Sequence, residues 1–456
     1  MPGRVRMGDV MSQIPDRLAQ VLTSDQVATT ATPSQTNDWL GQPGGPVAAV
    51  VHPMAADEVS KVLQLASQLG VPVQIQSGNT GLVGGSTPPR NGQAPILLCL
   101  DRMTGVRHID SDTGQLIAGA GTTIAEVQDV AAQHGWRYGV DLAARDTATI
   151  GGTVATNAGG VRVCAYGSTR AQVLGLEFVL ADGAVVSDRP GLSKDNTGYD
   201  LVGLLCGSEG TLAVVTQVRV KLWRPPMQAT TLALPVDGLV EAAALSGSAA
   251  GPGFSLLAAE VVDRSSWHAA TLMSDRADPL AHSAEGFVLL LEVGDGGEGQ
   301  GVAEVITERP ETVVATQMSQ RRLLWQLREI QTTLWSRLPG ALHKFDVSVP
   351  AAELDALAAE TEALTNRLGG RSGIFGHIRE GNLHIQLVLP GHEDPTRELL
   401  SLVGELGGSI SAEHGIGRYK SEYLDLRRSA AEMATMRAVK KSLDPQGLLN
   451  PGVLFR

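Results

Sequence analysis

The sequence predicts an α+β protein of two domains. A chain of 456 residues is too long for one ordinary hydrophobic core. Its first half alternates helix-like and strand-like patterns and carries three loops of small residues. At Arg224-Pro225-Pro226 the strand pattern stops, and an Ala/Leu-rich region with fewer glycines begins. These observations predict an N-terminal extension over 1–46, a first domain over 47–225 and a second domain over 226–456.

The first domain is expected to open with a helix followed by a strand. Apolar residues at helical spacing share one face, namely Val59, Val62, Leu63, Ala66 and Leu69. We expect Asp57 to cap this helix and Gly70 to end it. A hairpin should turn at Asp182-Gly183, between strands over 176–180 and 184–187. The other expected elements are strands over 71–75, 96–100, 115–119 and 211–222 and a helix over 124–134.

The second domain is also expected to mix helices and strands. Strand patterns cover 228–234, 286–292 and 346–349, and an amphipathic helix pattern covers 351–368. The Gly/Glu-rich stretch 294–301 is typical of a flexible loop. The chain shows no internal repeat.

Charge and composition narrow the functional classes. The net charge of −12 gives no electrostatic reason to bind nucleic acid or an anionic membrane. Cys99, Cys164 and Cys206 lie in apolar or glycine-rich surroundings, which favours buried thiols over a disulfide framework. No secretory signal pattern is present, and no run approaches the roughly 20 apolar residues of a membrane span. We therefore expect a cytoplasmic protein without structural disulfides.

The segment Gln76–Ser86 carries the first functional signal. It follows the expected strand over 71–75 and has glycines at 78, 81, 84 and 85. Close approach of the main chain to a pyrophosphate leaves no room for a Cβ, and amides that converge on an anion need positive φ at some positions. The spacing differs from the G-x-G-x-x-G of a nicotinamide fold, and Pro88-Pro89 forbids an immediate helix. We interpret the segment as a phosphate cradle, with an ordinary surface loop as the alternative.

Two further runs of small residues, Thr149–Gly160 and Gly207–Leu212, suggest one large ligand. In their order along the chain, their residue types and their spacing, the three segments resemble the FAD-binding domain of the vanillyl-alcohol oxidase/p-cresol methylhydroxylase superfamily. The resemblance covers roughly residues 47–452. It implies a two-subdomain FAD-binding domain of the p-cresol methylhydroxylase type and an α+β substrate-capping domain. The segment Asp444–Gly452 resembles a tail that returns to the flavin domain.

The resemblance also implies how FAD is held. Covalent members of the superfamily attach the flavin through a histidine or cysteine, but His52, His134 and Cys164 lie in no recognisable attachment motif, so noncovalent FAD is expected. The residues expected to contact FAD are Ser77, Gly78, Asn79, Thr80, Gly81, Gly85, Ser86, Asp141, Ile150, Gly151, Gly152, Thr153, Ala155, Thr156, Asn157, Ala158, Gly159, Gly160, Glu209, Gly210, Val215 and Asn450.

Motifs near the C-terminus point to one branch of this superfamily. Together with Lys194–Leu201, the runs around His377, His384 and Glu413 resemble the branch that contains D-2-hydroxyglutarate, D-lactate and glycolate dehydrogenases. These three residues match the metal ligands of the branch, and His414 matches its catalytic histidine. Two imidazoles and a carboxylate leave an open coordination position, which is typical of a catalytic divalent metal; zinc is expected here.

The spacing of the two histidines predicts a hairpin. His377 and His384 are seven residues apart, which would place them on opposite faces of one straight strand. If Arg379–Asn382 forms a hairpin loop, Ile378 faces Leu383 and His377 faces His384, with Cβ atoms roughly 5 Å apart. The two imidazoles are therefore expected directly opposite each other.

The resemblance implies FAD-dependent oxidation of a D-2-hydroxy acid to the 2-oxo acid. A metal-bound hydroxyl has a lowered pKa, a histidine near neutrality takes its proton, and a hydride passes to flavin N5. Arg328, Thr332 and Lys344 match elements that bind the substrate carboxylate, and Gln386 is a further expected substrate contact. Without the resemblance, Arg328 and Glu329 would read as a solvated helix face.

The motif departs from the usual form at two places. Arg379-Glu380 stands where Gly-Asp is usual, and Gln386 stands where hydroxyglutarate dehydrogenases tend to carry asparagine. A cation at position 379 would contact a second anionic group of the substrate or point to solvent. Both departures leave the particular 2-hydroxy acid open.

Two other functional classes remain open. The chain could be an oxygen-using oxidase of another small alcohol, or the noncatalytic flavin subunit of a multisubunit glycolate oxidase. Retention of Arg328, the three metal-ligand candidates and His414 argues against the second class, because a binding-only subunit does not need them. The expected electron acceptor is an electron-transfer flavoprotein or a quinone-linked or iron-sulfur partner, and the resemblance favours a monomer or homodimer.

Overall fold

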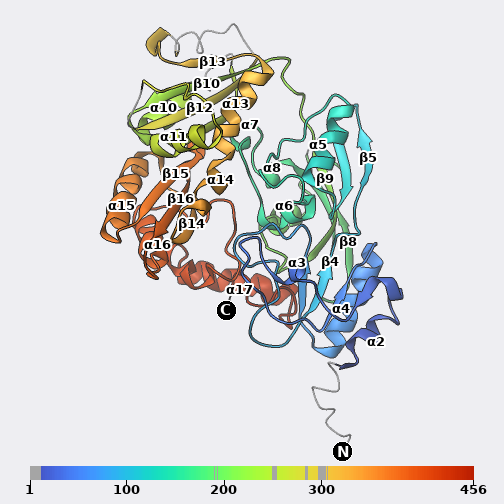
Figure 1. Cartoon of the computed structure of the whole chain (residues 1–456). Coiled ribbons are helices and arrows are strands. Elements are labelled where there is room, and N and C mark those ends of the chain that lie inside the picture. The colour runs from blue at the N-terminus through green and yellow to red at the C-terminus, as the bar shows by residue number, and fades with distance from the viewer. Residues whose placement is uncertain are drawn as a thin grey trace, which may run out of the picture. The chain divides into compact units, whose positions relative to one another are not determined.

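The computed structural model describes residues 12–188, 191–192, 194–248, 254–282, 286–295, 305 and 307–455. The chain divides into two compact units, whose elements are labelled in Figure 1. The first unit comprises residues 1–159, 167–224 and 414–456, and the second comprises 160–166 and 225–413. Both combine helices with sheets, which confirms the α+β class. Residues 296–301 of the expected flexible loop lie outside the described part.

The first unit begins with a four-stranded sheet in the order β1-β2-β4-β3. Strands β2, β4 and β3 are parallel, and β1 is antiparallel at the edge. Helix α4 (Ala56–Leu69) joins β2 to β3, and Gly70 ends it in the left-handed conformation, as expected. The expected cap is wrong, because the N-cap residue is Ala55 and Asp57 lies inside the first turn. The strands are β1 (Val27–Ala28), β2 (Ala49–Val51), β3 (Val73–Gln76) and β4 (Ile96–Cys99).

A second, antiparallel sheet of the first unit has the order β5-β6-β9-β7-β8. The hairpin expected at Asp182-Gly183 joins β7 to β8, with Gly183 at φ +89° and the Asp182 carboxylate accepting a hydrogen bond from the Ala184 amide. Its strands are β5 (Val106–Asp110), β6 (Gln115–Gly119), β7 (Val173–Val179), β8 (Val185–Asp188) and β9 (Val214–Lys221). The remaining helices are α2 (Ile14–Leu18), α3 (Pro33–Thr36), α5 (Ile124–Gln133), α6 (Ile150–Thr156), α8 (Thr169–Gln172), α9 (Leu201–Leu205) and α17 (Ala430–Leu443).

The second unit is built on a seven-stranded antiparallel sheet in the order β13-β10-β12-β11-β15-β16-β14. Strand β11 was not predicted; its sequence is a nearly continuous apolar run without the alternation that marks a half-buried strand. The strands are β10 (Ala229–Val236), β11 (Phe254–Asp263), β12 (Phe287–Asp295), β13 (Val313–Ala315), β14 (Ala341–Ser348), β15 (Arg371–His377) and β16 (Asn382–Leu389).

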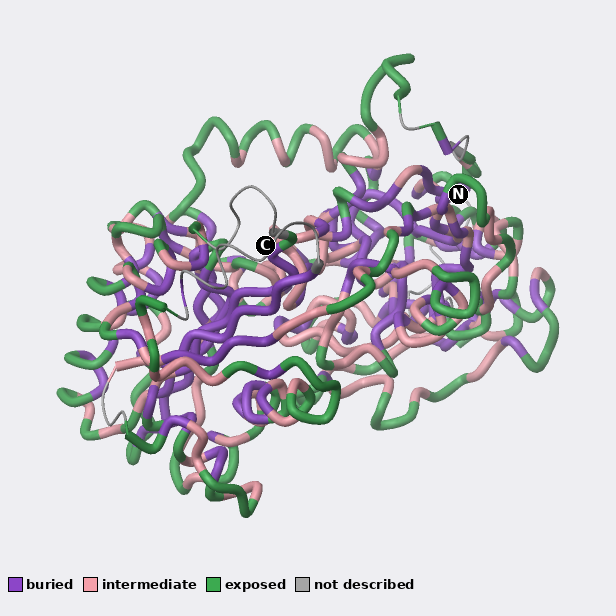
Figure 2. Tube along the Cα trace, turned by 90° about the horizontal axis from the view of Figure 1, so that it is seen from above, coloured by how far each residue is buried: buried purple, intermediate pink, exposed green. Residues whose placement is uncertain are grey.

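Two helices cover part of one face of this sheet. Trp267 of α11 and Leu324 and Leu327 of α13 share a hydrophobic cluster with Leu290 and Phe375 of the strands. Figure 2 shows that buried residues follow the strands while exposed residues lie on helices and loops. The helices of this unit are α7 (Val163–Tyr166), α10 (Leu239–Ser248), α11 (Arg264–Met273), α13 (Met318–Glu329), α14 (Gln331–Leu334), α15 (Leu354–Arg367) and α16 (Thr396–Glu405).

Candidate active site

The predicted phosphate cradle follows β3 directly, and its own polar groups hold it in shape. Asn79 has φ +48°, and its amide donates hydrogen bonds to the carbonyls of Ser34 and Asn37. The Asn79 side-chain oxygen accepts a bond from the Ser86 hydroxyl. The Ser77 hydroxyl lies 2.8 Å from that of Thr149, which caps helix α6 in the second small-residue loop. The first two loops are thus joined within one unit.

Glycine has two different uses in these loops. A Cβ on Gly78 would lie 2.2 Å from the Thr147 carbonyl oxygen. A Cβ on Gly151 would lie 2.6 Å from the Cβ of Ala120 and 2.9 Å from its carbonyl oxygen, so both glycines allow close packing. A Cβ on Gly81 or Gly85 would meet no atom within 3.5 Å. The nearest atoms would be in ordinary contact, namely Oγ of Ser86 at 3.9 Å from the Gly81 position and a Glu209 carboxylate oxygen at 3.6 Å from the Gly85 position. Packing within the chain therefore does not require glycine at 81 and 85, which leaves close approach of a ligand as the expected reason for glycine there.

Backbone strain concentrates at the residues expected to contact FAD. Asn79, Asn157, Glu209 and Asn450 all have φ between +44° and +52°, a region that non-glycine residues rarely occupy. Such conformations cost about 1–3 kcal/mol each and are frequent at ligand-binding sites. The remaining expected contacts lie in the same unit, apart from Gly160; among them, Val215 is buried on β9 and Asp141 pairs with Arg145 at 3.0 Å.

The C-terminal segment packs against the cradle within the first unit. The carbonyl of Asn450's side chain accepts hydrogen bonds from the Ile75 amide and from Gln74, and its Nδ2 donates to the Glu209 carbonyl. The Glu209 carboxylate accepts bonds from the Ile416 and Gly417 amides, and burial raises its pKa. The side chains of Asn450 and Glu209 therefore hold the loops in place.

Arg418 is a residue of this site that the sequence reasoning missed. Its guanidinium donates to the carbonyls of Gly84 and Thr87 in or beside the cradle, to Gln74, and to the Pro451 carbonyl. Burial lowers its pKa to about 10. An isolated arginine that binds carbonyls far away in the sequence leaves no local pattern by which it could be found.

In the second unit, β15 and β16 form the predicted histidine hairpin, but with a different register. The loop is Ile378–Gly381, with Gly381 in the left-handed conformation at φ +66°. His377 consequently pairs with Asn382, and His384 pairs with Phe375. The expected direct opposition is therefore wrong. The two imidazoles lie diagonally on one face of the sheet, with ring centroids 5.3 Å apart.

The hairpin brings the three predicted metal ligands together. One ligand atom each from His377, His384 and Glu413 lie within 4.8 Å of one another. Nε2 of His377 is 3.4 Å from Oε1 of Glu413. Oε1 of Glu413 also accepts a hydrogen bond from the Gly160 amide at 2.9 Å. Two nitrogens and a carboxylate oxygen on a partly buried surface fit the donor set of a divalent metal such as zinc.

Charge is concentrated around these ligands. Burial alone would lower the pKa of His377, but the carboxylates of Glu260 and Glu413 outweigh it and raise this pKa to about 10. Burial alone would raise the pKa of Glu413, but His377 and His384 hold it at about 2. Asp346, opposite His384 in the register, accepts bonds from the Asn382 side chain and the Glu413 amide. These contacts fix the Glu413 backbone beside the histidines.

The residues expected to contact the substrate come from α13, α14 and two strands. Arg328 is buried, and its Nε and Nη2 each lie 2.7 Å from Oε2 of Glu260. Lys344 donates to the Thr332 carbonyl, and burial lowers its pKa. Gln386 is buried opposite Lys344, and its amide donates to the Gln331 carbonyl. All four expected substrate contacts thus lie in the second unit.

The two unusual residues of the motif diverge from each other. Nη1 of Arg379 lies 3.4 Å from the position that a Cβ on Gly247 of α10 would take. Glu380 is an exposed residue, but partial removal of its carboxyl from water raises the pKa to about 7. The charge of His377 opposes this rise, and the negative charges of Glu260 and Glu413 add to it. Glu380, not Arg379, is therefore electrostatically linked to the metal-ligand candidates.

His414 follows Glu413 directly in the chain and begins the last stretch of the first unit. It is partly buried. The peptide bond to a predicted ligand limits how far its imidazole can lie from that ligand.

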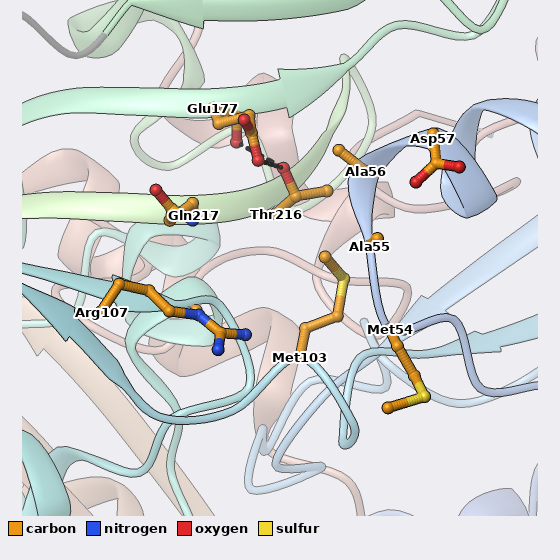
Figure 3. A pocket seen from close by; sticks show the side chains of 10 residues that line it. Met54, Ala55, Ala56, Asp57, Met103, Arg107, Glu177, Thr216 and Gln217 are labelled. Carbon is orange, nitrogen blue, oxygen red and sulfur yellow. Dashed lines mark hydrogen bonds between the residues drawn. The ribbon is translucent and has the colours of Figure 1, made fainter.

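A pocket of 310 Å³ in the first unit is unrelated to the predicted site (Figure 3). Met54, Asp57, Met103 and Arg107 line it, and Glu177 accepts a hydrogen bond from Thr216 at its wall. None of its lining residues is among the predicted contacts for FAD, metal or substrate. No helix among the described residues is long and apolar enough to cross a membrane.

The chain shares its fold with solved enzyme structures. p-Cresol methylhydroxylase superimposes with a TM-score of 0.76 at 16% identity, covering 99% of this chain and 97% of that one. 4-Ethylphenol oxidase from Gulosibacter chungangensis gives a TM-score of 0.72 at 18% identity, and the match covers 100% of this chain and 98% of that one. The fold is therefore the p-cresol methylhydroxylase type, as the sequence motifs predict.

Sequence comparison shows the family. Residues 47–189 match the FAD binding domain model, and residues 225–454 match the C-terminal domain model of FAD linked oxidases. D-2-hydroxyglutarate dehydrogenase of Xanthomonas citri pv. viticola is 34% identical over 92% of this chain and 91% of its own length. D-lactate dehydrogenase of Archaeoglobus fulgidus is 34% identical over 89% of this chain and 91% of its own length. The chain belongs to the FAD-linked oxidase family and is an FAD-dependent hydroxy-acid oxidoreductase.

Proposed function

We propose that this protein uses noncovalent FAD and a divalent metal ion, zinc by its donor set, to oxidise a D-2-hydroxy acid to the 2-oxo acid. One observation carries the proposal: His377, His384 and Glu413 meet within 4.8 Å. A purely structural cluster does not need two imidazole nitrogens and a carboxylate with one open position, whereas a catalytic metal site does. The D-2-hydroxy-acid dehydrogenases to which the chain is similar support the substrate class.

FAD, when bound, would supply the hydride acceptor at N5. Its pyrophosphate would be held by the cradle, because the loops around Asn79 and Asn157 adopt positive φ, which lets backbone amides converge on an anion, and because hydrogen bonds fix both loops. Noncovalent binding is proposed because His52, His134 and Cys164 lie in no recognisable attachment motif. Glu209 and Asn450 would act indirectly, by holding the loops.

A divalent metal, when bound, would act as a Lewis acid on the substrate hydroxyl. The chain's own residues then have three tasks. His377, His384 and Glu413 hold the metal, and His414, joined to Glu413, takes the hydroxyl proton. Arg328 binds the substrate carboxylate through Nη1, because Nε and Nη2 are already held by Glu260.

The remaining substrate contacts would surround the 2-hydroxy acid with polar and charged groups. Lys344 offers a positive charge at an exposed position. Its ammonium is still partly removed from water, which lowers its pKa, and an anion beside it would favour the charged form. Thr332 and Gln386 add a hydroxyl and an amide on the same unit. The proposed electron acceptor is an electron-transfer flavoprotein, or a quinone-linked or iron-sulfur partner.

Anaerobic bleaching of the flavin absorbance tests this function. The purified protein is mixed with matched D- and L-2-hydroxy acids, before and after treatment with a chelator. We expect bleaching by a D-isomer, loss of bleaching after chelation and recovery on addition of zinc. Bleaching that a chelator leaves unchanged would remove the metal from the mechanism, and bleaching by L-isomers alone would overturn the substrate class. Peroxide formation in air would separate an oxidase from a dehydrogenase.

A further inference from the structure

We infer that Glu260 is a positioning residue that holds His377 in its metal-binding tautomer and Arg328 in its substrate-binding position. The inference rests on the metal and substrate sites proposed above. Glu260 lies on β11, the central strand of the seven-stranded sheet, directly opposite His377 of β15. Its side chain is 1% exposed. A carboxylate in such a place is costly unless it is fully paired.

Both oxygens of Glu260 are engaged by predicted site residues. Oε1 is 2.5 Å from Nδ1 of His377, and Oε2 is 2.7 Å from Nε and Nη2 of Arg328. An ionised carboxylate only accepts hydrogen bonds, so Nδ1 must carry a proton. The other ring nitrogen, Nε2, is the one that faces Glu413 at 3.4 Å. Glu260 therefore directs the lone pair of His377 toward the proposed metal.

Arg328 makes this arrangement stable. Its guanidinium supplies the positive charge that a buried carboxylate needs, and its carbon Cζ lies 4.9 Å from the centre of the Phe375 ring. One carboxylate thus links a metal ligand to a substrate ligand. A change at Glu260 should alter metal affinity and substrate affinity together, which a simple ion pair would not do.

A glutamine at position 260 cannot replace the carboxylate. If its oxygen accepts from Nδ1 of His377, its NH₂ group faces the Arg328 donors. If the amide turns round, its NH₂ group donates to Nδ1 and forces the proton onto Nε2, where the metal should bind. Glutamate is therefore the residue that satisfies both neighbours at once.

The test compares zinc affinity in three forms of the flavin-loaded protein: wild type, Glu260→Gln and Asp278→Asn. Asp278 is a matched control because it is another buried carboxylate of the same unit, pairing with Arg264 and not with the metal-ligand candidates. Equilibrium dialysis against buffered free zinc, read as zinc per flavin, gives the dissociation constant. A group that hydrogen-bonds the other ring nitrogen of a metal-bound histidine typically contributes 10–100-fold to metal affinity. We expect Glu260→Gln to bind zinc about 10–100-fold more weakly, with a raised KM, and Asp278→Asn to bind as wild type does.

The outcomes separate this inference from the proposed function. Equal zinc affinity in wild type and Glu260→Gln would overturn the inference and leave the metal site standing. No zinc binding by wild type would overturn both. If Glu260→Gln does not fold, a crystal structure of the zinc-loaded wild type decides: zinc on Nε2 of His377 with Glu260 on Nδ1 supports the inference, whereas zinc on Nδ1 or on Glu260 itself overturns it.

Discussion

At the scale of single residues, Asn450 shows how one side chain can join distant parts of the chain. It is 4% exposed, and it binds the main chain at Ile75 and at Glu209. Its assignment as an FAD contact came from sequence motifs and stays a prediction. Its role between the loops could not be predicted, because the partners are hundreds of residues away.

Asn450→Ala should destabilise the first unit. The substitution leaves the Ile75 amide and the Glu209 carbonyl without their partner, and an unsatisfied buried group costs about 1–3 kcal/mol. Chemical denaturation followed by flavin fluorescence would show the loss. Asn366→Ala, at an exposed position of α15, is the control and should lie within about 0.5 kcal/mol of wild type. Equal stability of the two variants would contradict the role of Asn450.

Zinc affinity should rise with pH through the neutral range. The pKa of His377 is about 10 without metal, so the metal must displace a proton from it at any lower pH. Release of one proton predicts up to about tenfold tighter binding for each unit of pH. Zinc titrations at pH 6.5, 7.5 and 8.5 would measure the slope. A flat profile would show that His377 carries no proton to displace.

Arg379→Ala should leave KM for the 2-hydroxy acid within about twofold, because the guanidinium lies beside Gly247 of α10. Steady-state kinetics with a mono- and a dicarboxylic 2-hydroxy acid would check this. A selective loss of the dicarboxylic substrate would mean that Arg379 binds a second carboxylate after all.

At the scale of the elements, the histidine hairpin shows what a sequence pattern can and cannot define. The spacing of His377 and His384 correctly placed both on one face of a hairpin. It could not give the register, which depends on a turn of 3₁₀ helix over Ile378–Glu380 and on the left-handed Gly381. The Asn382 side chain anchors β16 to β14 through Asp346 and Val347. Such cross-strand bonds have no local signature.

Helix α11 offers a test of element stability. Asp278 accepts hydrogen bonds from Arg264 and Trp267 of this helix and from the Leu280 amide. Burial opposes its ionisation, but these donors outweigh burial and lower its pKa. Asp278→Asn should cost about 1–3 kcal/mol at neutral pH.

The pH dependence of this cost has a definite sign. The folded pKa of Asp278 is below its unfolded value, so its contribution is fully present above the unfolded pKa of about 3.9 and is lost as pH falls through the folded pKa. Urea denaturation of both forms at pH 7 and at progressively lower pH should show the difference shrinking. A constant difference would mean that the ionised carboxylate contributes nothing.

At the scale of the whole molecule, the first unit needs the C-terminal stretch. Arg418→Met should weaken FAD retention because four carbonyl or amide oxygens around the cradle lose their donor. Hydrogen bonds to charged groups contribute about 1.5–3 kcal/mol each, so we expect at least tenfold weaker binding of FAD. Fluorescence of released flavin after dilution measures the effect, with the exposed Arg427→Met as control. Unchanged retention in Arg418→Met would contradict this view of the tail.

The fold class was predictable from sequence because apolar periodicity and glycine-rich runs are local patterns, and the FAD contacts inferred from those runs stay a prediction. Glu260 and Arg418 were not predictable. Each acts through partners on other elements, and an isolated glutamate in an apolar strand or an arginine after a glycine looks unremarkable until those elements are assembled.

The short segment Gly160–Tyr166 limits how this protein can be recombined with its relatives. It belongs to the second unit, where Arg162 pairs with the buried Glu292 and the Cys164 thiol contacts the Leu256 carbonyl, yet residues of the first unit flank it on both sides. In a chimera that exchanged only 225–413, the seven native residues 160–166 would have to pack against the seven-stranded sheet of the relative instead of their own. Such a hybrid should become soluble and active only when those seven residues are exchanged as well.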